Sequence, residues 1–131
     1  MSDYTPVNAD KAYTLTATAA ITGGQLVSAS GAGTAAPSTT GDHSIGVAMH
    51  DAPSGGRFSI WPLSGYIHEL AVQNTLVVAA GGPVVAGTAG TIGPGSTLAA
   101  AAAAGTLLGI AITGGTGNAG LTVKARFLGI A

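Results

Sequence analysis

Few residues in this chain could do acid–base or metal chemistry: it has three histidines, five aspartates and glutamates, and no cysteine among 131 residues. Asp42-His43 and His50-Asp51 each place a carboxylate beside an imidazole, an arrangement that can serve general acid–base catalysis or metal binding. His43 and His50 are an odd number of positions apart, so in an extended strand their side chains leave opposite faces. These residues, and His68 beside Glu69, are therefore interpreted as solvated histidines at strand ends.

The rest of the sequence assembles no catalytic or metal-binding motif. There is no histidine pair with zinc spacing and no calcium loop, and a chain without cysteine forms no disulfide and no thiolate metal site. Leu63-Ser64-Gly65 lacks the strand-to-helix context of a nucleophile elbow. Gly114-Gly115-Thr116-Gly117 imitates a phosphate loop, but neither Lys-Ser nor Lys-Thr follows it. We expect a protein that is not an enzyme, with no catalytic, cofactor-binding or metal-binding residues.

Charged residues are scarce. They make up 7% of the chain, where typical soluble domains carry about 25%. The four basic residues, Lys11, Arg57, Lys124 and Arg126, are scattered, and the net charge is −1. Nucleic-acid binding needs clustered Lys and Arg against the phosphates, so the sequence predicts no nucleic-acid partner. A surface so poor in charge predicts instead that part of it is covered in an assembly.

No segment predicts a membrane partner. The most apolar stretch, Leu98 to Ile112, is mostly alanine and is interrupted by Gly105 and Gly109. A membrane-spanning helix needs about 20 predominantly apolar residues. The first residues, Met1 to Pro6, have no basic start followed by an apolar run, so they are not expected to act as a secretory signal.

Alternation of apolar and polar residues with a period of two predicts short strands. It occurs in four segments, 12–18, 45–49, 57–61 and 121–125, which are separated by Gly-rich turn clusters. Short strands with such turns are typical of a small β-barrel or sandwich. The run Ala99–Ala104 has high helix propensity but is short, so one or two helical turns and an extended loop both stay open. We expect an all-β fold with at most one short helix.

The chain contains an internal repeat. Three pairs of segments share their pattern of glycine and apolar residues: Gly23–Val27 with Gly81–Val85, Ser44–Met49 with Leu107–Ile112, and Phe58–Ile60 with Leu121–Val123. The last two pairs align without a gap between them, and this conserved phase favours duplication over chance. Superposing Gly46 on Gly109 should therefore bring Ile60 onto Val123.

One domain accounts for the whole chain. Residues 1–10 are polar and without periodicity, which predicts an N-terminal arm. Residues 11–131 are expected to form a single β domain built from two modules, residues 19–65 and 77–128. Because the chain has only six aromatic residues, the core of this domain must be filled by Val, Ile, Leu and Ala.

Trp61 is the one tryptophan of the chain. In the repeat it aligns with Lys124, so it is expected on the outward face, opposite Phe58 and Ile60. An exposed tryptophan is a common anchor of protein interfaces. Neighbouring loops or a second layer could also bury it, and both interpretations stay open. Tyr66 is expected near the same contact.

The turn-and-strand pattern resembles a known family. The residues that carry the resemblance are Ala20–Val27, Ile45–Ala48, the turn around Gly56, Leu108–Ala111 and Val123–Phe127. Together they look like the capsid cement, or head decoration, proteins of tailed bacteriophages. The resemblance implies a small β domain on the outer surface of the virion head, made in the host cytoplasm. Its partners would be the major capsid protein and itself, as a homotrimer at three-fold or quasi-three-fold positions.

The residues expected to touch the capsid or a neighbouring copy lie in the arm and around the tryptophan: Tyr4, Thr5, Pro6, Val7, Trp61 and Tyr66. Two other functions stay open. One is a different virion or extracellular β module, such as a tail or fibre adhesin that binds sugar. Adhesins usually cluster their aromatic residues, whereas here they are dispersed. The other is a small enzyme or metal-binding domain, for which the inventory of chemical groups is thin.

Overall fold

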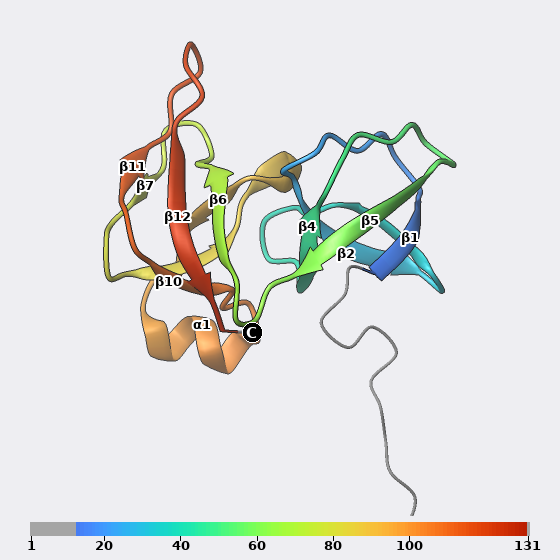
Figure 1. Cartoon of the computed structure of the whole chain (residues 1–131). Coiled ribbons are helices and arrows are strands. Elements are labelled where there is room, and N and C mark those ends of the chain that lie inside the picture. Colours follow the sequence, from blue (N-terminus) through green and yellow to red (C-terminus); the bar gives the residue numbers. More distant parts are fainter. Residues whose placement is uncertain (1–12, 131) are drawn as a thin grey trace, which may run out of the picture.

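The computed structural model describes residues 13–130, and these fold into two β modules that lie side by side (Figure 1). Module 1 comprises residues 13–63. Its strands are β1 (Tyr13–Ala17), β2 (Leu26–Gly31), β3 (Thr34–Pro37), β4 (Ser44–Ala48) and β5 (Arg57–Pro62). They form a closed barrel in the order β1-β3-β2-β4-β5, with β1 parallel to β3 and every other pair antiparallel.

Module 2 comprises residues 67–130. Its main sheet has the order β6-β12-β10-β8-β9, and a two-stranded ribbon joins β7 to β11. The strands are β6 (Ile67–Ala71), β7 (Val77–Val78), β8 (Pro83–Ala86), β9 (Ile92–Pro94), β10 (Gly109–Ala111), β11 (Gly115–Thr116) and β12 (Lys124–Gly129). A parallel bridge between Val72 and Ile92 brings the two edges of the main sheet together. The expected all-β fold is confirmed.

The two modules share one strand pairing. The order β1-β3-β2-β4-β5 of module 1 is matched by β6-β9-β8-β10-β12 in module 2. In each module a parallel seam closes the strand order, joining Ala17 to Ala35 in module 1 and Val72 to Ile92 in module 2. Below, two residues are called equivalent when they hold the same place in this pairing.

The pairing shifts the first segment of the expected alignment by one residue. Gly46 on β4 faces Val27, and Gly109 on β10 faces Val84. Val27 is therefore equivalent to Val84, and the expected match of Val27 with Val85 is wrong.

The last segment is shifted further. Ile60 pairs with Ala48, and Phe127 pairs with Ala111, so Ile60 is equivalent to Phe127. The expected superposition of Ile60 on Val123 is wrong, because the connection that follows β10 is four residues longer than the one that follows β4. This connection contains β11 and projects from the module before β12 begins (Figure 1).

Gly46 and Gly109 are glycines because a neighbouring strand runs close over both. A Cβ atom on Gly46 would collide with the carbonyl oxygen of Trp61, and one on Gly109 with that of Leu128. The shared glycine of the two copies thus has a steric cause, close approach of two backbones. It also shows that Trp61 is equivalent to Leu128, and the expected match of Trp61 with Lys124 is wrong.

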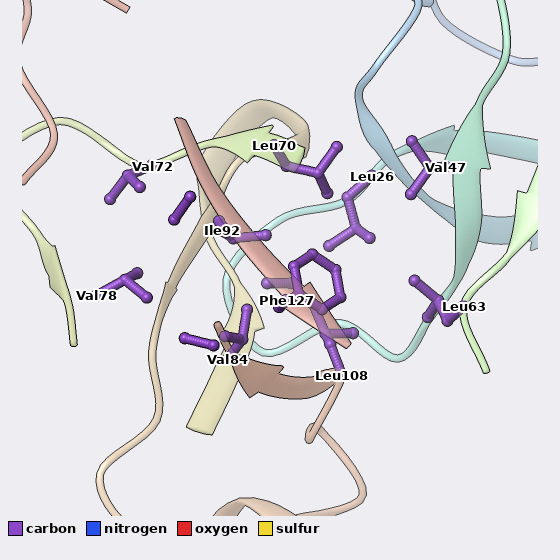
Figure 2. Close-up of a cluster of buried hydrophobic side chains, with 13 residues drawn as sticks. Leu26, Val47, Leu63, Leu70, Val72, Val78, Val84, Ile92, Leu108 and Phe127 are labelled. Atoms are coloured by element: carbon purple, nitrogen blue, oxygen red, sulfur yellow. The ribbon is translucent and has the colours of Figure 1, made fainter. Parts of the chain in front are cut away.

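Each module encloses an apolar core, and the two cores differ in extent. The core of module 1 contains Leu15, Ala17, Ile21, Val27, Ala35, Ala48, Ala52, Phe58 and Ile60. The core of module 2 is larger because three residues of module 1, Leu26, Val47 and Leu63, join it from outside (Figure 2). These three side chains leave the outer face of the first barrel and pack towards Leu70 and Phe127, so the modules are joined by apolar packing.

The alanine run forms the α-helix of the described residues, α1 (Leu98–Ala104). Thr97 caps it by accepting a hydrogen bond from the Ala100 amide (3.0 Å), and Gly105 ends it in the left-handed conformation. Of its residues only Ala101 is buried. No helix between residues 13 and 130 is long and apolar enough to cross a membrane.

Candidate interaction surface

The candidate contact residues divide between the arm and the junction of the modules. Tyr4, Thr5, Pro6 and Val7 lie outside the described residues. Trp61, near the end of β5, keeps 38% of its surface exposed, so it is not buried within its own fold. Tyr66, in the connection to β6, is half-buried. Their ring centroids lie 5.9 Å apart, so the structure brings these two candidates together.

The two rings begin an aromatic row that runs from the surface into the core of module 2. The Tyr66 ring is 6.1 Å from the His68 ring, which in turn is 5.7 Å from the Phe127 ring. The His68 Nε2 atom lies 3.0 Å from the Pro62 carbonyl oxygen, to which a neutral imidazole can donate. Burial lowers the pKa of His68, and the hydrogen bond to Pro62 opposes that shift. The expectation that His68 is solvated is wrong; it is a packed residue.

The other histidines are at the surface. His43 and His50 are exposed, and the His50 Nδ1 atom is 3.0 Å from the Asp51 carbonyl oxygen. Within residues 13–130, no group of three or more His, Asp or Glu side chains is placed to hold a metal ion.

A cleft of about 330 Å³ lies where the modules meet. Glycine, alanine and threonine dominate its walls, and two of its lining side chains, Glu69 and Lys124, are ionisable. The lining includes no histidine, serine or aromatic ring. The cleft therefore offers no aromatic platform on which a sugar ring could stack.

The outer face of module 2 carries an apolar row that the sequence did not reveal. Pro83, Ile110, Leu128 and Ile67 are directly paired across β8, β10, β12 and β6. Leu128 and Ile67 are exposed, and Ile110 and Pro83 are half-buried. Ile130, just beyond β12, is also exposed. We call Pro83, Ile110, Leu128, Ile67 and Ile130 the outer apolar face.

A signal for this face was present in the alternation of 124–130. Phe127 points into the core, so Leu128 and Ile130 must point away from it. The expected strand at 121–125 hid this pattern, because it placed the second copy of the strand four residues too early.

The comparison with solved structures gives a match over nearly the whole chain. No protein-family model matches the chain, and no curated protein does. The chain is similar in structure to the N base of the head fibre protein gp8.5 of bacteriophage phi29, with a TM-score of 0.66 and 14% sequence identity. The match covers 90% of this chain and 92% of the other. At this identity it shows a shared fold that includes both modules.

Proposed function

We propose that this chain is a structural protein of a bacteriophage virion that decorates and stabilises the outer surface of the head. The observation that carries the proposal is the similarity of fold, over nearly the full length, to a protein whose description places it in a phage head fibre. The low content of charged residues and the outer apolar face support it, because both are expected of a surface that is covered in an assembly.

Decoration needs binding rather than chemistry. A protein that binds only the assembled head shifts the equilibrium towards that state by mass action. Several weak contacts on one lattice add to a strong attachment, since each after the first is effectively intramolecular. The proposed partners are the major capsid protein and further copies of the chain, as a homotrimer. The proposal includes no enzymatic activity, no cofactor and no nucleic acid.

The proposal is tested by adding the purified chain to phage heads that lack it. Binding should saturate at a fixed number of copies per head, and decorated heads should withstand heating or low salt better than bare heads. Unassembled capsid protein is the control and should bind much more weakly. Absence of saturable binding to any cognate head would contradict the proposal.

Trp61→Ala should weaken attachment to heads without unfolding the chain. Loss of an interface tryptophan can cost about 2 kcal/mol, roughly a thirtyfold change in affinity. Leu121→Ala, which shortens an exposed apolar side chain on the loop before β12, is the matched control and should bind as the wild type does. A titration of both variants on bare heads measures the difference. If Trp61→Ala and Leu121→Ala bound heads with equal affinity, Trp61 would not belong to the capsid contact.

A second candidate function is an adhesin that binds sugar. The observation in its favour is the exposed Trp61 ring beside Tyr66, because adjacent aromatic rings can stack on a sugar. Glycan-array binding that Trp61→Ala abolishes, with unchanged attachment to heads, would favour this function over decoration.

A further inference from the structure

The two modules meet through the outer face of module 1 and a loop tip of module 2. Each module has both kinds of surface, but each uses only one of them in this contact. Module 1 buries its outer face at Leu26 and Leu63 against module 2, whereas the residues that the structure describes leave Ile67, Leu128 and Ile130 exposed on the equivalent face of module 2. We propose that module 1 of a second copy covers the outer apolar face, so that copies join head to tail through a repeat of the junction within the chain. This names the surface behind the self-association proposed above.

The exposure of equivalent residues carries the proposal. Leu63 at the end of β5 is 3% exposed, while its equivalent Ile130 at the end of β12 is 48% exposed. Val47 is buried against module 2, while its equivalent Ile110 is half-buried. Both faces are apolar. The remaining equivalent pair, Trp61 and Leu128, is exposed to a similar extent, so the difference between the faces lies at Leu26, Val47 and Leu63, which module 2 covers.

The other half of the junction is also present twice. In module 2, the tip between β8 and β9, which contains the 3-10 helix η1 (Thr88–Gly90), reaches module 1. The Gly90 amide donates to the Ser38 carbonyl oxygen (2.8 Å), and the Gln25 Nε2 donates to the Ala89 carbonyl oxygen (3.0 Å). Gly90 is buried there.

The equivalent tip of module 1 makes no such contact with the other module within the described residues. It lies between β2 and β3, and its Gly33 has the same positive φ as Gly90, 72° against 74°. Gly33 is exposed, and a Cβ atom added to it would meet no atom within 4 Å. A Cβ atom on Gly90, in contrast, would lie 2.7 Å from the Gln25 Cβ and 3.0 Å from the Leu26 carbonyl oxygen.

A head-to-tail contact between copies fits these surfaces better than a face-to-face dimer does. Within residues 13–130 the face of module 2 and the tip of module 1 are both unused, and the bonds of the module 2 tip to Gln25 and Ser38, beside Leu26, show that such a tip can pack at the edge of such a face. A contact between different surfaces is heterologous and can propagate from copy to copy until a ring closes. Two identical faces packed on each other would leave both tips unused.

Two variants test the two halves separately. Ile130→Asp places a charge on the face, and Leu121→Asp places one on an exposed loop as its matched control. Gly33→Asn adds a side chain at the tip, where asparagine tolerates positive φ. Gly55→Asn is its matched control, because Gly55 also has positive φ and open space around it. Circular dichroism and thermal unfolding establish that each variant folds.

Native mass spectrometry and light scattering of the purified full chain, without heads, give the result. The wild type and both controls should self-associate, and Ile130→Asp and Gly33→Asn should each need at least about tenfold higher concentration to do so. An equimolar mixture of these two variants should form a one-to-one heterodimer, since it restores one intact junction.

Three results would overturn the proposal: a monomeric wild type at every accessible concentration, folded variants that assemble like the wild type, or a mixture that stays monomeric. Because heads are absent from the experiment, its failure would leave attachment to the capsid standing. Failure of attachment would likewise leave self-association standing.

Discussion

Modules 1 and 2 reach one strand pairing with different side chains in the core. Phe58 of module 1 is equivalent to Ala125 of module 2, while Ile60 is equivalent to Phe127. The large ring therefore sits at successive inward positions of the last strand in the two modules. All four side chains are buried. This fold therefore requires apolar side chains at the inward positions and a core whose volume is filled, whereas the position of the phenylalanine ring can vary.

The parallel seams differ in the same way. Module 1 places Ala17 opposite Ala35, and there β1 and β3 pair at two positions. Module 2 places the larger Val72 opposite Ile92, and a single bridge remains. Larger side chains at the seam thus accompany a shorter run of paired residues. The closure of module 2 therefore depends more on side-chain packing, including the packing of Leu26 from module 1.

The largest effect is expected from Phe58→Ala. Phe58 is 1% exposed in a core of small residues, so its loss should leave a cavity and cost about 3–5 kcal/mol of unfolding free energy. Adding Ile60→Phe gives module 1 the arrangement of module 2, and the double variant should recover part of that loss. Denaturant unfolding of the wild type, both single variants and the double variant measures the coupling.

A double variant no more stable than Phe58→Ala alone would contradict the equivalence of the two cores. It would mean that the ring position in each module is fixed by its own surroundings.

The fold class could be predicted from the sequence, while the register of the repeat could not. Leu121 and Val123 continue the alternation of Ala125 and Phe127, so a shift of four residues keeps every inward position inward. Only the closed pairing shows that β12 begins at Lys124. Pattern alone cannot distinguish registers that differ by an even number of residues.

The shift of one residue has a different cause. Leu26 and Val27 are both fully buried, one against module 2 and the other inside module 1. Two adjacent buried residues break the alternation of buried and exposed positions, and this alternation would have fixed the alignment of the strand with its copy in module 2. The outer apolar face was missed because of the shift of four residues, which hid the alternation of 124–130.

A smaller, pH-dependent effect should separate His68 from its equivalent Tyr13, which is exposed. Burial holds the pKa of His68 below its ordinary value of 6.5, so protonation favours the unfolded chain. The stabilisation is complete above about pH 6.5 and is lost as the pH falls from there through the lowered pKa.

His68→Gln should flatten the dependence of stability on pH in this window, since glutamine keeps a donor for the Pro62 carbonyl oxygen but does not titrate. His50→Gln removes an exposed histidine and should keep the wild-type slope. Chemical denaturation between about pH 4 and 8 measures both. A wild-type slope in His68→Gln would show that another group is responsible.

The smallest effect concerns the outer faces of β6 and β12. There Arg126 Nε donates to Glu69 Oε2 at 2.8 Å, with side chains 60% and 48% exposed, and module 1 has a Thr14–Ser59 hydroxyl pair at the equivalent place. Exposed ion pairs contribute about 0.2–1 kcal/mol, so Glu69→Thr with Arg126→Ser should change the unfolding free energy by less than about 1 kcal/mol. A double-mutant cycle at low and high salt should give a small coupling that salt reduces further.

A larger coupling, insensitive to salt, would mean that the pair is shielded from water in solution, as it would be if a second copy covered the neighbouring Leu128. The smallest energetic difference between the modules is thus also a probe of whether the outer apolar face of module 2 is free.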